Sequence, residues 1–497
     1  MSYAPHKLVP EGFTALQSLA ALPEVHAASA VPESVEYVAY LVSPDGALPD
    51  AVAASRDDLA LAGFEAEAAS TFVLAQGGTP VVLVGVGAAD DVTVDSIRDA
   101  AAAAARGMSK KATSLAVVTE DHGLDAAVVA QAVAEGAQLA RYRYRSLQAE
   151  PKDPPLGALT IVVTGADQAT VASGIAAAEP GVRATVVARD LANTPAGFLT
   201  ATNIADEAVR LGAAYGFEAE VYDKAALIEM GCGGLLGVNA GSTEEPRMVV
   251  LRYRGGGSKH LGMVGKGIMY DSGGISLKPS DPMHLLMKID MGGAAAVLGA
   301  FTAMRDLGVS ANVSGWLMCT DNMPSGSATK LGDVLVARGG KTVEVKNTDA
   351  EGRLVMMDGL VLATEDEVDA VIDIATLTGA ALMALGKSRA ALFGNDQQLV
   401  DQVKAAAEVV DEPVWQLPLE KKYRKQLDSD IADIANLGGQ FAGATTAALF
   451  LNEFVGDTPW AHVDIAGTMQ AEADDAWRSA GATGYGARLL AQVAKEF

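Results

Sequence analysis

The feature that most constrains the fold is an alternation of short, β-branched apolar runs with Ala-rich stretches of helical spacing. In the first third of the chain we predict strands over 35–42, 81–86, 115–119 and 159–164, and helices over 94–107, 124–141 and 168–178. Strands that alternate with helices favour a mainly parallel sheet covered by helices on both faces. The chain is therefore predicted to be an α/β protein.

The same alternation restarts further along the chain. We predict strands over 248–253, 261–264, 313–318, 334–337, 343–345 and 370–375, and helices over 293–307 and 353–363. A chain of 497 residues is too long for one ordinary core. We expect a smaller N-terminal α/β domain over 1–175 and a larger α/β domain over 176–497, whose mainly parallel central sheet is covered by helices. Prolines within 153–155 or 179–180 indicate where the linker between the two domains begins. The apolar residues of 182–211 have helical spacing, which is interrupted at 193–195.

Charge and cysteine content exclude several classes of protein. The formal net charge of −25 repels phosphate backbones, so it argues against nucleic acid as a partner. Two cysteines give no disulfide framework, which fits a reducing, cytoplasmic compartment. We expect no signal peptide, because the first residues contain no apolar segment. Turn residues interrupt the long uncharged runs, so we expect no membrane span.

The histidines also restrict the kind of metal site. None of the six histidines has the i, i+4 spacing of a zinc-binding helix, and no His/Cys cluster occurs. Carboxylates must therefore dominate the shell of any bound metal, which points to Mn, Mg or Zn in an oxygen-rich site.

Three acidic clusters follow predicted strands in the second domain. Asp271 lies in a glycine-rich segment after a strand, Asp290 precedes Gly292-Gly293, and Asp349 and Glu351 lie just before a predicted helix. If the backbone at 349–351 is extended, these two side chains point the same way and can converge on one cation. Arg353 would then begin the helix and hold an anion with its forked guanidinium group.

Each of these residues also has a simpler interpretation. Asp349 and Glu351 can cap a helix or lie in a solvated turn, and Asp290 alone is typical of an N-cap. A lone Lys266 or Lys278 is typical of a surface. Asp373 and Asp464 lie in apolar strands, so we expect both to be buried carboxylates whose hydrogen bonds are satisfied. An indirect role at the site stays open for both. We expect the histidines at ordinary packing or surface positions. Taken alone, these residue patterns therefore indicate no more than an acid-rich metal or phosphoryl site.

The segment Asn347-Thr-Asp-Ala-Glu-Gly-Arg-Leu354 resembles the signature octapeptide of the leucyl aminopeptidase family. Other family blocks occur in the same order, and the likeness covers residues 180 to 497: Val264-Gly-Lys-Gly267, Asp271-Ser-Gly-Gly-Ile-Ser-Leu-Lys278, Asp290-Met-Gly-Gly-Ala-Ala-Ala296, Asn322-Met-Pro-Ser-Gly326, Gly332-Asp-Val334, Ala375-Thr-Leu-Thr-Gly379 and His462-Val-Asp-Ile-Ala-Gly467. The first 170 residues match only in general pattern.

The resemblance implies a role for each matching position. It implies two divalent metal ions per subunit, Mn²⁺ or Zn²⁺, held by Lys266, Asp271, Asp290, Asp349 and Glu351. Asp271 and Glu351 match the bridging positions, Asp349 would bind one metal, and Lys266 and Asp290 would bind the other. A lysine must be neutral to bind a metal, and a neighbouring cation lowers its pKa. Lys278 and Arg353 match the catalytic positions.

The implied activity is release of N-terminal amino acids, preferably leucine and similar apolar residues, from peptides with a free N-terminus. A hydroxide that bridges the metals would attack the carbonyl, with Lys278 stabilising the oxyanion. The family places bicarbonate on Arg353 as the general base. By family position, the side-chain pocket would be lined by Met287, Thr376, Gly379, Ala466 and Met469. Methionines and small residues suit an apolar side chain such as that of leucine. The family also implies a homohexamer.

Alternative functions differ in substrate and partner. A narrower dipeptidase such as a cysteinylglycinase has the same site, and a moonlighting DNA-binding regulator would need a local basic patch in an acidic chain. An inactive scaffold is disfavoured because all seven ligand and catalytic positions are present. Departures from the family pattern, at Ala196, Tyr270 and Asp321, touch no implied ligand.

Overall fold

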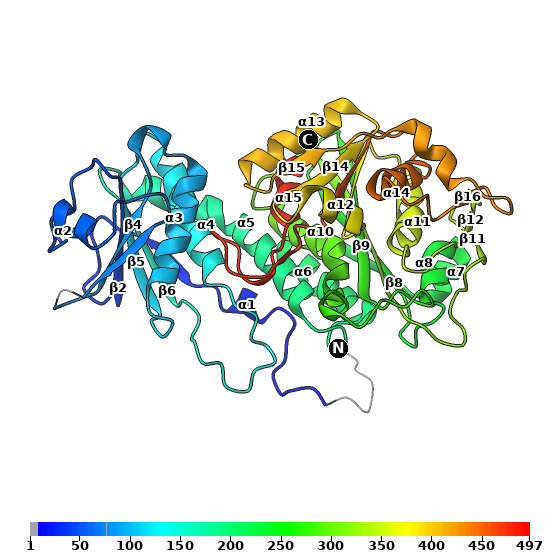
Figure 1. The fold of residues 1–497 in the computed structure, drawn as a ribbon, viewed down its shortest axis with the longest axis horizontal. Helices are drawn as coiled ribbons and strands as arrows, with labels where there is room; N and C mark the ends of the chain where they lie inside the picture. The colour runs from blue at the N-terminus through cyan, green and yellow to red at the C-terminus, as the bar shows by residue number, and fades with distance from the viewer. Residues whose placement is uncertain (1–7, 76) are drawn as a thin grey trace. The chain divides into compact units, whose positions relative to one another are not determined.

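The computed structural model describes residues 8–75 and 77–497, which form two compact units. The small unit comprises residues 12–186 and 471–481. The large unit comprises residues 8–11, 187–470 and 482–497. Both units are layered α/β structures, as Figure 1 shows.

The small unit contains a six-stranded sheet in the order β1-β6-β5-β2-β4-β3. All neighbouring strands are parallel except β3, which runs antiparallel to β4. The strands are β1 (Glu24–Ala27), β2 (Tyr37–Val42), β3 (Thr71–Leu74), β4 (Val81–Gly85), β5 (Ser114–Thr119) and β6 (Ala158–Val163). The helical elements are α1 (Gln17–Ala20), α2 (Arg56–Leu61), the short η1 (Ala89–Asp91), α3 (Val94–Gly107) and α4 (Ala126–Ala140).

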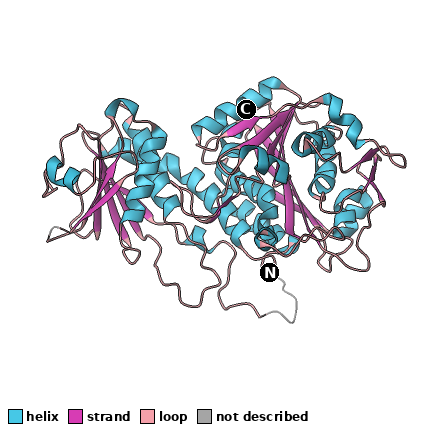
Figure 2. Ribbon diagram, viewed as in Figure 1, coloured by secondary structure: helices cyan, strands magenta, loops and turns pink. Residues whose placement is uncertain are grey.

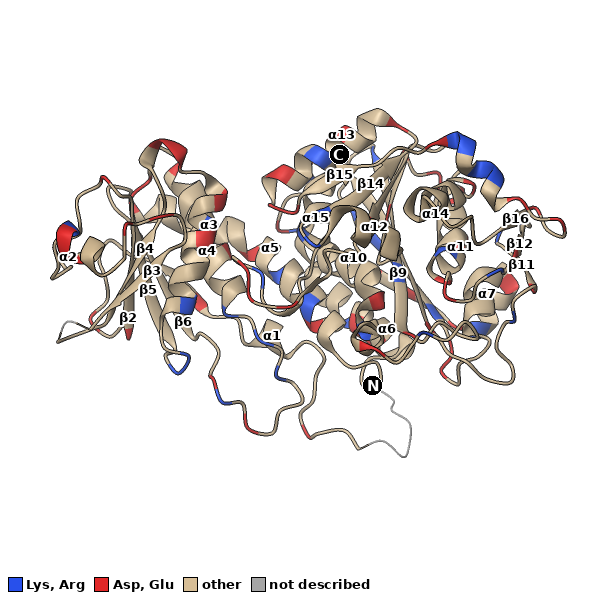
Figure 3. Ribbon diagram, viewed as in Figure 1, with Lys and Arg blue, Asp and Glu red and all other residues tan. Residues whose placement is uncertain are grey.

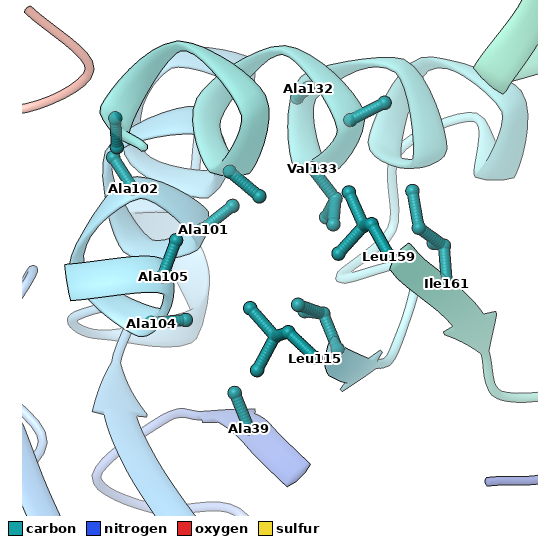
Figure 4. Packing of buried hydrophobic residues seen from close by; sticks show 14 of the residues in the cluster. Ala39, Ala101, Ala102, Ala104, Ala105, Leu115, Ala132, Val133, Leu159 and Ile161 are labelled. Atoms are coloured by element: carbon teal, nitrogen blue, oxygen red, sulfur yellow. The ribbon is translucent and has the colours of Figure 1, made fainter. Parts of the chain in front are cut away.

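The core of the small unit depends on the close approach of α3 and α4. Most alanines of both helices belong to one buried core with Leu115, Leu159 and Ile161 of the sheet (Figure 4). A Cβ atom added at Gly136 would lie 2.0 Å from the carbonyl oxygen of Arg98, so the two backbones nearly touch. The Ala-rich sequence therefore serves helix packing, because small side chains permit this approach.

The large unit contains an eight-stranded sheet in the order β15-β14-β17-β13-β9-β10-β8-β7. Its central strands β17, β13, β9 and β10 are mutually parallel. The strands are β7 (Glu218–Tyr222), β8 (Arg247–Arg254), β9 (His260–Asp271), β10 (Asn312–Asn322), β13 (Ala370–Ala375), β14 (Ala390–Gly394), β15 (Val414–Gln416) and β17 (Trp460–Asp464). A three-stranded sheet contains β11 (Val334–Val336), β12 (Thr342–Glu344) and β16 (Ile434–Ala435).

Helices lie on both faces of the large sheet (Figure 2). One layer contains α6, α10 and α15, and the other contains α8, α11 and α14. The helices after residue 200 are α6 (Ala201–Tyr215), α7 (Lys224–Met230), α8 (Gly233–Asn239), α9 (Pro282–Leu285), η2 (Met287–Met291), α10 (Gly292–Ala303), α11 (Gly352–Glu365), α12 (Gly379–Leu385), α13 (Gln397–Val409), η3 (Lys421–Leu427), α14 (Gly443–Asn452) and α15 (Ala487–Glu496). Two further two-residue strands are β18 (Gln470–Ala471) and β19 (Gly481–Ala482).

The structure confirms the α/β class and most predicted elements, but it corrects several details. Strand β13 has the bounds predicted for it, and β9 continues well beyond its predicted end at residue 264. The linker predicted at 179–180 is wrong, because helix α5 (Gln168–Asn193) runs through Pro180 without a break. Its end at Asn193 matches the predicted break at 193–195.

No helix within residues 8–75 and 77–497 has both the length and the apolar character that crossing a bilayer requires.

Substitution of Gly136 by Ala should destabilise the small unit. The new Cβ would lie 2.0 Å from a backbone oxygen, so α3 and α4 must move apart. We expect the free energy of unfolding to fall by about 2 kcal/mol, despite the higher helix propensity of Ala. Urea unfolding followed by circular dichroism measures the change.

Gly78→Ala is the matched control, because a Cβ atom there meets no atom within 4 Å. Equal unfolding midpoints for Gly136→Ala and wild type would contradict the close approach of the two helices.

Candidate active site

The predicted acidic clusters meet at the carboxyl ends of the central parallel strands. Asp271 ends β9, Asn322 ends β10 and Asp464 ends β17. Thr376 follows β13 directly. Ligands of open α/β sheets bind at this edge, where connections leave the strands. The site lies wholly within the large unit.

Lys266 is the buried centre of the first group of charges. Its Nζ atom lies 2.8 Å from a carboxylate oxygen of Asp290 and 2.9 Å from Glu351 Oε1. It also donates a 2.8 Å hydrogen bond to the carbonyl oxygen of Thr376. Three segments that are distant in sequence thus converge on one side chain.

Lys278 forms a second group nearer the surface. Its Nζ atom lies 2.7 Å from Asp271 Oδ2 and 2.6 Å from Asp349 Oδ1. The Lys278 side chain is 18% exposed, whereas that of Lys266 is 3% exposed. Asn322 Nδ2 donates to Asp271 Oδ1 and to the carbonyl of Thr348, which joins the two acidic segments.

The backbone at Asp349 and Glu351 differs from the prediction. The segment 347–350 forms a turn, and Glu351 has helical dihedral angles at the start of α11, so the expected extended backbone is wrong. The turn separates the two carboxylates: Glu351 approaches Lys266, and Asp349 approaches Lys278. Helix capping does not account for Glu351, because its side chain accepts no hydrogen bond from the helix backbone. Asp290 lies within η2, so it is not the N-cap of α10.

Two glycines make this convergence sterically possible. A Cβ atom at Gly293 would lie 2.1 Å from the carbonyl oxygen of Ile374, so α10 begins directly against the sheet. A Cβ atom at Gly352 would lie 2.7 Å from Cε of Lys266. The glycines therefore leave room for the sheet and for the buried lysine.

Burial and charge oppose each other at these groups. Burial lowers the pKa of Lys266, but Asp290, Glu351 and Asp271 raise it above its ordinary value. Burial and the charge of Asp271 raise the pKa of Glu351 to about 8. Burial raises the pKa of Asp290 to about 6, against the opposing charge of Lys266. Ionised carboxylates crowded in a buried site are expensive without cations.

The donor atoms fit a metal ion. Asp271, Asp290 and Glu351 each offer a carboxylate oxygen, and these oxygens lie within 4.8 Å of one another. Two oxygens bound to the same ion can lie no further apart than twice the metal–oxygen distance, which is about 2.1–2.5 Å. One ion can therefore bind all three carboxylates. Oε2 of Glu351 is buried without a hydrogen-bond partner among the described residues. Carboxylate oxygens suit Mg, Mn or Zn.

Arg353 lies in the first turn of α11, as predicted, and is buried. Its Nη1 atom donates a 2.8 Å hydrogen bond to the carbonyl oxygen of Asn436. Its Nε atom has no hydrogen-bond partner among the residues that the structure describes. Burial lowers the pKa of Arg353 to about 10. A buried guanidinium with an unused donor can bind an anion.

Asn436 is the residue that sequence reasoning missed. It is fully buried, and its Oδ1 atom accepts from the backbone N–H of Lys346 at 2.8 Å. Its Nδ2 atom donates to the carbonyls of Asn347 and Ala350 at 2.7 and 3.3 Å. One amide thus holds the turn that carries Asp349. Asp433 and Gly438-Gly439 flank Asn436, but nothing in this local pattern indicates that its amide contacts residues 346–350.

The predicted pocket residues lie in segments that follow the same strands. Thr376 Oγ1 donates a 2.7 Å hydrogen bond to Asp290, which places it beside the acidic cluster. Met287 lies in η2 with Asp290. Met469 is buried next to Gly292. Gly379 begins α12, with open space where a Cβ atom would lie.

Asp464 joins these loops. Its carboxylate accepts hydrogen bonds from the N–H groups of Leu377 and Ala466, both at 3.1 Å, and from Thr378 Oγ1 at 2.7 Å. It therefore holds the loops that carry Thr376, Gly379 and Ala466.

Asp373 is a satisfied buried carboxylate, as predicted. Its oxygens pair with His462 Nδ1 at 2.5 Å and accept from Trp460 Nε1 at 2.6 Å. This histidine is a packed core residue.

Comparison with known proteins identifies the family. The model of the cytosol aminopeptidase family catalytic domain matches residues 186–491, and that of its N-terminal domain matches residues 52–151. A probable cytosol aminopeptidase of Alkaliphilus metalliredigens is 41% identical over 424 residues, covering 83% of this chain and 84% of the relative. One from Acidobacterium capsulatum is 39% identical over 473 residues, covering 92% and 91%.

Solved structures agree with this assignment. The bottromycin maturation enzyme BotP in complex with Mn is 38% identical, with a TM-score of 0.83, covering 93% of this chain and 99% of that one. A mutant of tomato leucine aminopeptidase is 30% identical, with a TM-score of 0.85, covering 96% and 97%. The chain therefore belongs to the metal-dependent cytosol aminopeptidase family, and it is an aminopeptidase, a metallo-exopeptidase.

Proposed function

We propose that this aminopeptidase releases leucine and similar apolar residues from the N-termini of peptides with two divalent metal ions, Mn²⁺ or Zn²⁺. The observation that carries the proposal is the buried group of Asp271, Asp290 and Glu351, whose oxygens lie within 4.8 Å of one another. Lys266 and Asp349 complete the proposed ligand set. The bound ions would supply an activated water and polarise the scissile carbonyl.

The chain's own residues would orient the substrate and stabilise charge. Lys278 is partly exposed at the rim of the acidic group, so its ammonium can donate a hydrogen bond to the carbonyl oxygen as negative charge develops there. Arg353 would hold bicarbonate through its unused Nε donor, and the bicarbonate would accept the proton of the attacking water.

Side-chain selection would come from the loops after β13 and β17 and from η2. Met287, Thr376, Gly379, Ala466 and Met469 offer two flexible thioethers and several small groups, which suits the branched chain of leucine. We also propose a domain boundary near residue 175, a homohexamer and a cytoplasmic location. The description of the relatives as cytosol aminopeptidases and two free, buried cysteines support the cytoplasmic location.

Removal of metal should abolish activity reversibly. We expect dialysis against a chelator to remove hydrolysis of leucyl amide, because the crowded carboxylates require cations, and we expect Mn²⁺ or Zn²⁺ to restore it. The measurement is the initial rate, together with metal content by mass spectrometry. Full activity in protein shown to contain no metal would refute the proposal.

The same preparations can be tested with a panel of aminoacyl amides and with cysteinylglycine. Turnover of cysteinylglycine alone would favour the narrower dipeptidase.

Two substitutions should separate metal binding from oxyanion stabilisation. We expect Glu351→Gln to lose both bound metal and turnover, because it removes a proposed bridging carboxylate. We expect Lys278→Met to retain metal while kcat falls about a hundredfold to a thousandfold. Metal content and steady-state kinetics provide the two readouts.

Glu408→Gln and Lys404→Met, on the surface of α13, are matched controls and should behave like wild type. Wild-type rates in either site variant would overturn the assigned roles.

The contacts of Asn436 predict that it positions the octapeptide. Asn436→Ala removes the amide that holds the backbone of Lys346, Asn347 and Ala350. A displacement of about 1 Å can cost about a hundredfold in rate, so we expect kcat to fall about tenfold to a hundredfold with little change in KM. The measurement is kcat and KM at matched metal content.

Asn395 offers a matched control, because its amide also bridges backbone groups, at Trp460 and Thr458. We expect Asn395→Ala to lower the melting temperature but to leave kcat unchanged. Equal kcat values in the two variants would show that Asn436 supports only the fold.

A further inference from the structure

A group of basic side chains in the small unit is unexplained by peptide hydrolysis. Arg141-Tyr-Arg-Tyr-Arg145 follows α4 directly, and Arg106 lies in the last turn of α3. Lys and Arg recur along the connection from α4 to β6 (Figure 3). We call Arg106, Arg141, Arg143 and Arg145 the arginine cluster. Its positive charge is conspicuous in a chain with a net charge of −25.

The arginine cluster lines a small cavity. All four arginines and Lys110 surround a space of about 130 Å³, and the acidic residues among its described lining are Asp153 and Asp474. Five basic groups against two acidic groups leave an excess of positive charge. Such a cavity favours anions even though the whole protein repels them.

The two acidic residues neutralise the cluster only in part. Asp474 pairs with Arg143, and its Oδ2 atom lies 3.5 Å from Arg106 Nε. That Nε atom is buried and makes no hydrogen bond within the described part of the chain. Asp153 lies 3.9 Å from Arg145, which is the limit of an ion pair. The Nε donor of Arg106 therefore remains unused in the cavity.

Like charges also repel one another here. Burial, followed by the charges of Arg143 and Arg145, lowers the pKa of Arg141. Burial and the charge of Arg143 likewise lower the pKa of Arg145, against the opposing charge of Asp153. A bound anion would relieve this repulsion.

A second, more apolar cavity adjoins the first. It has a volume of about 330 Å³, and it shares Arg141, Arg143, Arg145 and Asp153 with the basic cavity. Its other walls are mainly apolar: Ala21, Leu22, Pro23, Tyr142, Pro151, Pro154, Pro155, Leu156 and Val186. A ligand of about this size can place an apolar body against these walls and a charged group among the arginines.

We propose that the small unit binds an organic phosphate, with the phosphate group on the arginine cluster and the apolar body in the adjoining cavity. A phosphate dianion matches the excess of positive charge better than a carboxylate does. Guanidinium groups also donate two parallel hydrogen bonds to phosphate oxygens. All lining residues belong to the small unit, so this site is separate from the metal site.

Titration calorimetry with phenyl phosphate tests the proposal on the full-length metal-loaded protein. We expect the double variant Arg143→Gln, Arg145→Gln to weaken binding about tenfold or more, because it removes two charged donors. Asp153→Asn should instead tighten binding about threefold or more, because it removes a competing anion without removing a donor. The matched control is the variant Arg254→Gln, Arg305→Gln, whose side chains are 72% and 52% exposed in the large unit, and it should bind like wild type.

Three comparison arms identify the ligand class and the site. Inorganic phosphate should bind at least about tenfold more weakly than phenyl phosphate, and neutral benzyl alcohol should not bind detectably. Binding should persist in Glu351→Gln. Loss of binding in Glu351→Gln, with retention in the arginine double variant, would assign the phosphate to the metal site and overturn the proposal. Equal affinity for inorganic and phenyl phosphate would overturn the role of the apolar cavity.

Discussion

The buried ion-pair group around Lys266 is the constraint on which the large unit depends. Lys266, Asp290 and Glu351 are almost completely buried, and the lysine Nζ atom lies 2.8 Å from Asp290 and 2.9 Å from Glu351. Removal of one partner from such a group leaves an uncompensated buried charge, which costs about 3–5 kcal/mol. The strand β9, the short helix η2 and the start of α11 must therefore be fixed relative to one another.

The parallel sheet provides this fixed arrangement. Strand β9 lies between β10 and β13, so its backbone is hydrogen-bonded on both sides and Lys266 projects from a rigid position. Gly293 allows α10 to begin against β13, and Gly352 leaves space for the lysine stem. A site built on strands and helix ends holds its side chains more accurately than one built on loops alone.

The two lysines differ in how tightly they are held. Lys266 has three partners, including a backbone carbonyl, and is enclosed by the protein. Lys278 contacts two carboxylates at the partly exposed edge of the site. Its long side chain can therefore change partners without disturbing the core, whereas Lys266 cannot. This difference agrees with the metal-binding position proposed for Lys266 and with the substrate-facing position proposed for Lys278.

The sequence predicted the helices and strands better than the contacts between them. Hydrophobic periodicity and composition were sufficient to predict β13 and α3, because a buried strand and an Ala-rich helix are recognisable from their local sequence. The family resemblance supplied Lys266, because a lone lysine is typical of a surface. The turn at Asp349 escaped prediction because a two-residue spacing does not distinguish an extended backbone from a turn. Asn436 escaped it for a deeper reason: its partners are backbone groups of residues 346–350, and every sequence supplies such groups. Contacts of this kind form only when the fold brings together residues that are about ninety positions apart in the sequence. The residues that position a site are therefore harder to predict from one sequence than the charged residues of the site.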